Sequence, residues 1–394
     1  MSPRNLFDEG GPHYGGPSDH TESAYHYLNR AAEPSRQHIR QLLEGWYAEH
    51  HDDNNDVRSR FQSDDQHQHL GAWWELYTAA VYRRLGYSVR VHPEIPGTDN
   101  KPDFLVTRGA ISQYVECVIT TGKEAEKNRA GQQYIFDCIN RVAHTDFMVD
   151  LDFKRIGTSD PRVADITTPL ETWLASLDAD RVLADHDGGQ DYPAYEFDAR
   201  DWTLSVVAIA LSPPSRGVPG RILGVYPGSP VQVIDDVSRI RKALNKKGAK
   251  YAALEQPLDR PLIVALQCTS MFAGQDDVAK ALYGSTAFHY YQDDPGRAVE
   301  WFRKRDGYWR QGPPARGTRV SAVLCGENIR YWDIAAKLPT MFLNPWASQS
   351  LTATDGFATV HVRDSGEIVS TAADLSAPAL LEIDDHWPFM DDTQ

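Results

Sequence analysis

The stretch that decides the fold is residues 66–121, and its second half reads KPDFLVTRGAISQYVECVITT from Lys101 to Thr121. Its first half repeats apolar side chains at helical spacing and then turns to β-branched and aromatic residues. Pro102 cannot donate a hydrogen bond to a neighbouring strand, so it fits the first position of a strand. The stretch therefore predicts a helix over 66–85 and strands over 87–92, 102–106 and 113–119.

Three acidic residues lie inside these apolar elements. Glu75 stands mid-helix, Asp103 follows the proline, and Glu116 lies between Val115 and Cys117 in the last strand. A buried carboxylate is costly unless it is paired, hydrogen-bonded or bound to a cation. Because the three acids fall on three elements that lie close together in the sequence, we expect them to converge on one site.

In these residues the chain resembles the PD-(D/E)XK nuclease superfamily. The family pattern is a helix with Glu, a strand with Pro-Asp and a strand with Glu-x-Lys. It is matched here by Glu75, Pro102-Asp103 and Glu116-Cys117-Val118, over about a quarter of the chain. The resemblance implies a restriction-endonuclease-like core and a Mg²⁺-dependent nuclease. Val118 departs from the pattern, because it stands where the family has its lysine.

Asp103 and Glu116 would hold Mg²⁺ (or Mn²⁺), with Glu75 as an outer ligand, since Mg²⁺ prefers carboxylate oxygens. The missing amine has two replacement candidates. Lys101 precedes the proline, and Lys123 opens the helix expected after the last strand. Lys123 is the better placed, because a long side chain at a helix start can reach back over the strand end. Both lysines can equally be surface residues.

Composition limits the partners that the chain can have. Its 394 residues carry a net charge of −15, so bulk charge does not hold it on nucleic acid and any DNA contact must be local. Four scattered cysteines without a Cys-x-x-Cys pair indicate buried free thiols in a reducing compartment. We see no signal peptide and no membrane-spanning stretch, so we expect a cytoplasmic protein.

Two local basic clusters are the candidate DNA contacts. One lies on a helix expected over 234–245 and just beyond it, and the other lies in a loop-like region over 290–316 that also holds Tyr308 and Trp309 for base stacking. Solvated helix faces are also commonly basic, so the clusters can equally be ordinary solvent-exposed surface that contacts no nucleic acid. The residues proposed to contact nucleic acid are Arg241, Lys242, Lys246, Lys247, Arg303, Lys304 and Arg310.

We expect an α/β protein in which a restriction-endonuclease-like core (helix, mixed sheet, helix) carries an appended α/β portion. The expected segments are an N-terminal arm and helix (1–60), the nuclease-like core (61–157), a polar acidic connector (158–203), a second α/β portion (204–350), and C-terminal strands with an acidic tail (351–394). The helix and strand that complete the core are placed at 122–144 and 147–156.

Two functions follow from this reading. The first is a metal-dependent DNA nuclease, or a protein derived from one, with a setting in nucleic-acid defence suggested by the superfamily. The second is a catalytically inactive module that binds DNA or protein, in a complex or a homo-oligomer. The feature that separates them is whether a lysine amine reaches Asp103 and Glu116.

Overall fold

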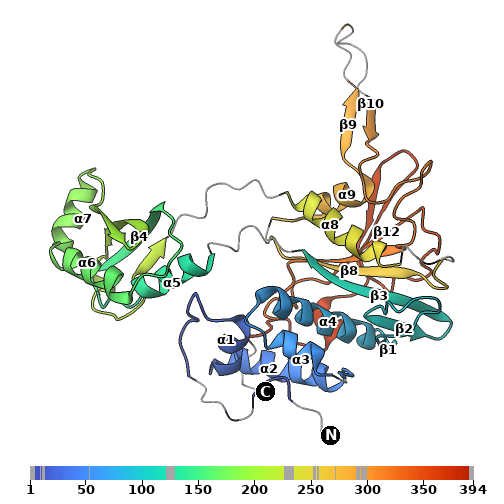
Figure 1. Ribbon diagram of the computed structural model, residues 1–394, viewed down its shortest axis with the longest axis horizontal. Helices are drawn as coiled ribbons and strands as arrows, with labels where there is room; N and C mark the ends of the chain where they lie inside the picture. The colour runs from blue at the N-terminus through green and yellow to red at the C-terminus, as the bar shows by residue number, and fades with distance from the viewer. Residues whose placement is uncertain are drawn as a thin grey trace. The chain divides into compact units, whose positions relative to one another are not determined.

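A computed structural model describes residues 5–8, 10, 14–52, 54–120, 129–225, 235–251, 254, 257–270, 272–289, 293 and 300–389. The chain divides into two compact units (Figure 1). The main unit comprises residues 1–16, 23–121 and 235–394, and the inserted unit comprises 17–22 and 122–234. Within the described ranges, no helix is long and apolar enough to cross a membrane.

The main unit is built on one eight-stranded mixed sheet with helices on both faces (Figure 1). Its helices are α1 (Ala24–Arg30), α2 (Pro34–Ala48), α3 (Asp56–Phe61), α4 (Gln66–Arg84), α8 (Asp236–Ala249), α9 (Gln275–Tyr283) and α10 (Ala377–Leu381). The strands of the sheet are β1 (Ser88–Val91), β2 (Phe104–Arg108), β3 (Ile111–Thr120), β8 (Leu262–Cys268), β11 (Ala322–Glu327), β12 (Thr340–Leu343), β13 (Thr359–Val362) and β14 (Ile368–Thr371).

The strand order in this sheet is β1-β2-β3-β8-β11-β12-β13-β14. The first three strands are antiparallel neighbours, whereas β3, β8 and β11 run parallel. Every residue of β8 is buried, as expected for a parallel strand that is covered on both faces. The centre of the sheet therefore lies at β8 and β11, and β3, which carries Glu116, is the next strand to β8.

Successive residues of β3 point to opposite faces of the sheet. Val115 and Cys117 pack in the core shared with α2, α3 and α4, whereas Tyr114 packs in the core shared with α8 and α9. Glu116 has the parity of Tyr114, so its side chain points toward α8. The two faces of one strand thus meet different helix layers.

The helix α4 positions the first acid in the core. Asp65 caps its N-terminus by accepting hydrogen bonds from the backbone N–H groups of His67 and Gln68. The helix ends before Gly86, whose positive φ of 81° suits a residue without a side chain. Almost every residue from His69 to Tyr82 is buried, so Glu75 lies inside protein rather than on a solvated face.

The inserted unit has its own sheet and core. Its strands are β4 (Phe147–Arg155), β5 (Ala194–Ala199), β6 (Trp202–Ala210) and β7 (Leu223–Val225), in the order β5-β6-β4-β7. Its helices are α5 (Arg129–Ile139), α6 (Val163–Ala175) and α7 (Ala179–Asp187), with a short 3₁₀ turn at Pro213–Ser215. A separate cluster of buried apolar side chains joins these helices to β4 and β6.

The elements that complete the main sheet differ from those expected. The helix and strand predicted at 122–144 and 147–156 became α5 and β4, which belong to the inserted unit. The strand beside β3 is instead β8, and α8 packs on β3. The expected segments 61–157 and 204–350 are each divided between the two units. The chain is a mixed α/β protein, as predicted.

Three stretches contain more regular structure than the sequence pattern indicated. The N-terminal arm includes α1, and the connector at 158–203 includes α6, α7 and β5. The loop-like region at 290–316 includes β10 (Glu300–Arg303), which pairs with β9 (Thr286–His289) in a two-stranded ribbon. All four cysteines are buried free thiols, as expected.

Candidate functional site

Asp103 stands at the start of β2 and is fixed by β3. Its Oδ2 accepts a hydrogen bond from the backbone N–H of Cys117 (2.6 Å). Its own carbonyl accepts one from the backbone N–H of His92 (3.0 Å). These bonds place the Asp103 carboxylate at the junction of β1, β2 and β3, where the side chains of both helix layers can reach it.

Glu75 approaches Asp103 from α4 and is only 4% exposed. Its Oε2 accepts a hydrogen bond from Arg60 (2.7 Å), whereas its Oε1 is buried and has no partner among the described residues. Burial and then the negative charge of Asp103 raise the pKa of Glu75 to about 7, although Arg60 acts in the opposite direction. One oxygen of a buried carboxylate is thus left without a positive or donor group.

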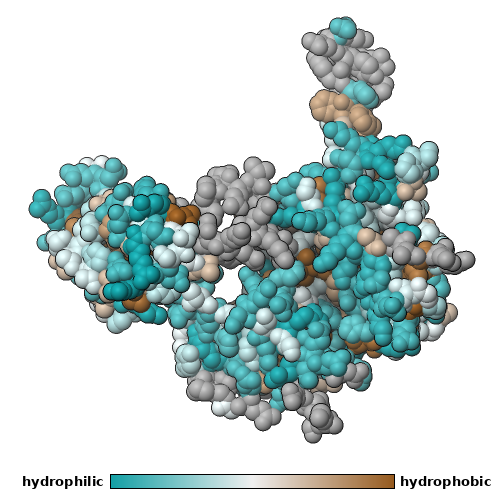
Figure 2. Space-filling model, viewed as in Figure 1, coloured by the Kyte–Doolittle hydropathy of each residue, from teal (hydrophilic) through white to brown (hydrophobic). Residues whose placement is uncertain are grey.

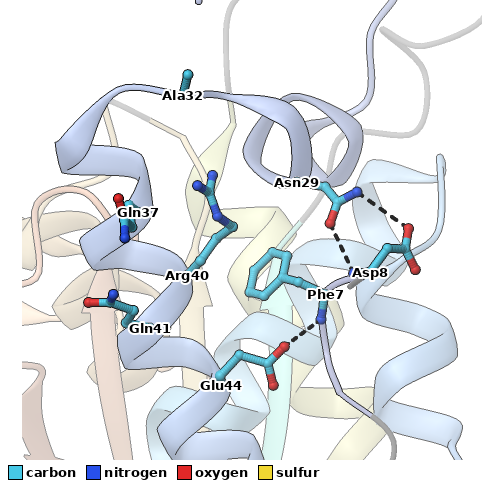
Figure 3. A pocket seen from close by; sticks show the side chains of 8 residues that line it. All are labelled: Phe7, Asp8, Asn29, Ala32, Gln37, Arg40, Gln41 and Glu44. Atoms are coloured by element: carbon cyan, nitrogen blue, oxygen red, sulfur yellow. Dashed lines mark hydrogen bonds between the residues drawn. The ribbon is translucent and has the colours of Figure 1, made fainter. Parts of the chain in front are cut away.

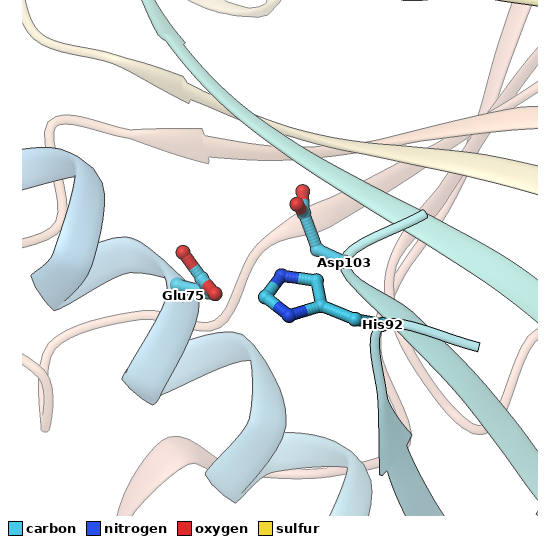
Figure 4. A group of neighbouring side chains, drawn as sticks. All are labelled: Glu75, His92 and Asp103. Atoms are coloured by element: carbon cyan, nitrogen blue, oxygen red, sulfur yellow. The ribbon is translucent and has the colours of Figure 1, made fainter. Parts of the chain in front are cut away.

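His92 completes a cluster with these two acids (Figure 4). One potential ligand atom from each of Glu75, His92 and Asp103 lies within 4.8 Å of the others. His92 follows β1 directly and has a φ of +45°, a left-handed conformation that is uncommon for a residue other than glycine. Its imidazole is exposed, so the cluster is open to solvent on that side.

Glu116 is fully buried on the opposite side of Asp103 and has three partners from the α8 region. Lys247 Nζ donates to Glu116 Oε2 (2.6 Å), and Lys250 Nζ donates to Oε1 (2.6 Å). The Tyr251 hydroxyl donates to the same Oε1. Lys247 Nζ also lies 3.4 Å from Asp103 Oδ2, so one ammonium group bridges the two carboxylates.

The carboxylates around Lys247 favour the charged form of its ammonium group. Burial lowers the pKa of Lys247, but the neighbouring carboxylates of Asp103 and Glu116 outweigh burial, and its pKa is raised. Burial and the adjacent Glu116 carboxylate raise the pKa of Tyr251, which keeps its hydroxyl protonated. Lys247 therefore remains a cation, and Tyr251 remains a hydrogen-bond donor.

The three predicted acids lie close together, but Glu75 and Glu116 lie on opposite sides of Asp103. Asp103 lies between Glu75 and His92 on the α4 side and Glu116 and Lys247 on the α8 side. Val118 packs against the α8-side core. Lys123 lies outside the described residues. Lys101 is exposed and pairs with Glu94 (3.5 Å), and its backbone carbonyl accepts a hydrogen bond from Lys250.

The predicted nucleic-acid contacts separate into three groups. Lys247 belongs to the carboxylate site, whereas Lys242, Lys246 and Lys304 are exposed. The other three, Arg241, Arg303 and Arg310, are partly buried. Arg241 donates hydrogen bonds to the carbonyls of Ala281 and Lys280, and Arg303 donates to those of Gly284 and Gly366. Arg310 follows a buried aromatic pair in the sequence. That pair, Tyr308 and Trp309, is 5% and 1% exposed, so neither side chain is free to stack on a base.

Sequence reasoning missed His92, Lys250 and Tyr251, and assigned Lys247 a different role. The available signal was the spacing of Lys247, Lys250 and Tyr251, because residues three and four apart share a face of a helix. Lys247 and Glu116 are 131 residues apart, so no local pattern connects them.

A separate hollow of about 500 Å³ lies between the N-terminal segment, α1 and α2 (Figure 3). Its charged groups are already used within the fold. Glu44 accepts the backbone N–H groups of Leu6 and Phe7, and Arg40 donates to the carbonyls of Leu28 and Ala31. The carboxylate cluster is therefore the better candidate for chemistry.

Comparison with known proteins gives no relative: no family model, no curated protein and no solved structure matches this chain. The assignment of a function therefore depends on the site itself.

Proposed function

We propose that this chain is a metal-dependent nuclease that hydrolyses phosphodiester bonds in DNA. The observation that supports the proposal is the position of Lys247, whose ammonium group lies 2.6 Å from Glu116 Oε2 and 3.4 Å from Asp103 Oδ2. The PD-(D/E)XK pattern needs an amine beside these two acids, and the sequence has Val118 at the motif position. A lysine from α8 supplies the amine instead.

The order of elements is consistent with the same proposal. Helix α4, the antiparallel strands β1, β2 and β3, helix α8 and the parallel strand β8 follow one another in the main unit. We interpret this order as a restriction-endonuclease-like core in which the inserted unit separates β3 from α8. This interpretation places Lys247 on a core helix rather than on a peripheral basic surface.

The cluster of Glu75, His92 and Asp103 suits a divalent cation. Glu75 Oε1 is buried and has no partner within the described part of the chain, and a cation would satisfy it. A bound divalent cation supplies Lewis-acid polarisation of the scissile phosphate and a lower pKa for a bound water. The set of two carboxylates and one imidazole suits Mn²⁺ better than Mg²⁺, because Mg²⁺ strongly prefers oxygen ligands.

The other residues orient the reaction and balance its charge. Lys247 is placed to donate a hydrogen bond to an attacking water or to a phosphate oxygen on which negative charge develops. Lys250 and Tyr251 hold the Glu116 carboxylate in place and act as positioning residues. Hydrolysis forms a bond between the water oxygen and phosphorus and breaks the phosphorus–ester oxygen bond. The leaving oxygen takes up a proton.

The first test is cleavage of plasmid, linear duplex and single-stranded DNA with Mg²⁺ or Mn²⁺. We expect Lys247→Met and Asp103→Asn to lower the rate by roughly 100-fold or more, because each removes a group that stabilises the transition state. Lys280→Met is the matched control, since Lys280 lies on the neighbouring helix α9 and pairs with Asp277. Equal rates for wild type and Lys247→Met would refute the proposed role of this amine.

The second test measures metal binding without DNA, by titration calorimetry. We expect wild type to bind Mn²⁺ at least about tenfold more tightly than Mg²⁺. His92→Ala removes the nitrogen ligand, so it should lose most of this preference while two carboxylate ligands remain. If His92→Ala binds both cations as wild type does, the metal is not held by this cluster.

A binding module that does not cleave DNA is the second candidate. The favouring observation is that Lys247, Lys250 and Tyr251 already satisfy Glu116 without any ion. If wild type cleaves none of the three substrates with either cation and binds neither cation, the ion pair is structural and the nuclease proposal fails for these substrates.

A further inference from the structure

The α8 side of the carboxylate site already holds two positive charges. Lys247 Nζ lies 2.6 Å from Glu116 Oε2 and 3.4 Å from Asp103 Oδ2. Lys250 Nζ lies 2.6 Å from the other oxygen of Glu116, Oε1. Together the two carboxylates and the two ammonium groups carry no net charge. A divalent cation is therefore not needed on this side to balance the acids.

The α4 side is different, because one guanidinium group serves two acids there. Arg60 donates hydrogen bonds to Asp56 Oδ2 and to Glu75 Oε2, at 2.7 Å each. Two carboxylates thus share one cation, and this side keeps a net negative charge. Opposite charges attract more strongly in a partly buried site than in water. The charge balance therefore directs a divalent cation to the cluster of Glu75, His92 and Asp103.

The amine of Lys250 lies among the oxygen atoms that a hard cation prefers. It donates to Glu116 Oε1 at 2.6 Å and to the backbone carbonyl of Lys101 at 2.5 Å. Carboxylate and backbone carbonyl oxygens are common ligands of hard divalent cations, which complete their coordination with water. The ammonium group thus occupies a position that suits a hydrated cation.

The oxygen atoms around this amine are held in place by other groups. The carbonyl of Lys250, the residue that caps the C-terminus of α8, accepts a hydrogen bond from Asn100 Nδ2 (2.8 Å). The Tyr251 hydroxyl and Lys247 Nζ each donate to one oxygen of Glu116. The Glu116 carboxylate should therefore keep its orientation when the Lys250 amine is removed.

We propose that Lys250 takes the place of a divalent cation between Glu116 and the Lys101 carbonyl. In wild type this position binds no metal ion, although the sequence pattern assigned Glu116 to the metal. Without the amine, Glu116 Oε1 and the Lys101 carbonyl form a second site for a hard cation such as Mn²⁺ or Mg²⁺. This inference deepens the description of the proposed nuclease site, but it does not require that the chain cleaves DNA.

Solvent reaches this position. The Lys250 side chain is 26% exposed, whereas that of Glu116 is fully buried. The surface of the main unit around α8 is mostly hydrophilic (Figure 2). A hydrated ion can therefore approach Glu116 Oε1 once the amine is gone. Uptake of the ion is favoured because the buried acid would otherwise lack one of its two counter-charges.

The test counts bound Mn²⁺ per chain by equilibrium dialysis of the full chain. Lys250→Met keeps an unbranched side chain and removes its charge, so it should bind one more Mn²⁺ than wild type. Lys250→Gln removes the charge with a polar side chain and should give the same result. Lys250→Arg keeps the positive charge, so its count should equal that of wild type.

A double variant locates the additional ion. Glu116→Gln in the Lys250→Met background removes the carboxylate ligand, so the additional ion should be lost. Lys280→Met is the matched control, because Lys280 is 49% exposed and lies 3.7 Å from Asp277, a carboxylate that water can already solvate. Its count should equal that of wild type. Circular dichroism checks that each variant is folded.

Equal numbers of bound Mn²⁺ in wild type and Lys250→Met overturn the inference. An additional ion that persists in the double variant, or that also appears in Lys250→Arg, overturns it as well. Lys250→Gln gives the same decision if Lys250→Met does not fold. A wild type without any bound ion refutes the metal cluster of the proposed function, whereas the difference between wild type and Lys250→Met still decides the role of Lys250.

Discussion

At the scale of single residues, the site shows how far a sequence pattern reaches. Glu75, Asp103 and Glu116 were identifiable because an acid inside an apolar element needs a partner, and all three converge. Their partners were not identifiable in the same way. Lys247 comes from a helix 131 residues after Glu116, and His92 is one of fourteen histidines in the chain. Long-range proximity, rather than local spacing, selects these two residues.

His69, a buried histidine of α4, makes the stability of the protein depend on pH. His69 is 1% exposed, and its Nδ1 lies 2.6 Å from the carbonyl oxygen of Phe61. Burial lowers the pKa of His69 to about 4, from 6.5 for an exposed imidazole. Between these values the unfolded chain binds the extra proton, so stability is full above pH 6.5 and falls as the pH drops toward 4.

The expected size of this effect follows from the two pKa values. From pH 7 to pH 5, His69 should contribute a loss of about 2 kcal/mol to the free energy of unfolding. His69→Asn should remove that part of the slope, as measured by urea unfolding at several pH values. His386→Asn, which changes an 85% exposed side chain, should keep the wild-type slope. A His69→Asn slope equal to wild type would contradict the prediction.

At the scale of elements, the local sequence pattern predicted the bounds of helices and strands better than it predicted which strands pair. The stretch 66–85 predicted α4 to within one residue, and the stretch 113–119 predicted β3 to within two residues at each end. The partner of β3 was missed, because α5 with β4 and α8 with β8 have similar local patterns. Which pair joins the sheet depends on contacts across the insertion. The position of a strand could therefore be predicted from the local sequence, whereas its neighbour in the sheet could not.

The close packing of α4 against β11 can be tested by substitution of Gly326. A Cβ at Gly326 would overlap Gln267 Oε1 and lie 2.5 Å from the Trp74 ring, and both of these side chains are buried beneath α4. Gly326→Ala should therefore lower the free energy of unfolding by about 1–3 kcal/mol, through overpacking. Gly45→Ala is the matched control, because a Cβ at Gly45 meets nothing within 4 Å.

Thermal or urea unfolding followed by circular dichroism measures both variants. Gly45 lies inside α2, so its replacement should raise stability by about 0.5–1 kcal/mol, since alanine favours a helix. A Gly326→Ala variant as stable as wild type would show that Trp74 can move away from β11. Such movement would also displace Glu75, the next residue of α4, and should weaken the proposed binding of a metal ion.

At the scale of the whole molecule, the two units have separate hydrophobic cores, and we expect them to unfold in separate steps. Leu204 is fully buried in the core of the inserted unit, and Leu266 is fully buried in the main unit. Leu-to-Ala changes in a core cost about 2–5 kcal/mol. Calorimetry of wild type should therefore resolve two transitions. Leu204→Ala should lower one of them by roughly 10 °C, and Leu266→Ala should lower the other.

The proposed metal site gives a second test of this separation. Glu75, His92 and Asp103 all belong to the main unit, and a ligand stabilises only the fold that binds it. Mn²⁺ should therefore raise the transition that Leu266→Ala lowers and leave the transition that Leu204→Ala lowers unchanged. If both substitutions lowered one common transition, the two cores would be a single cooperative unit, and the insertion would be part of the fold that holds the site.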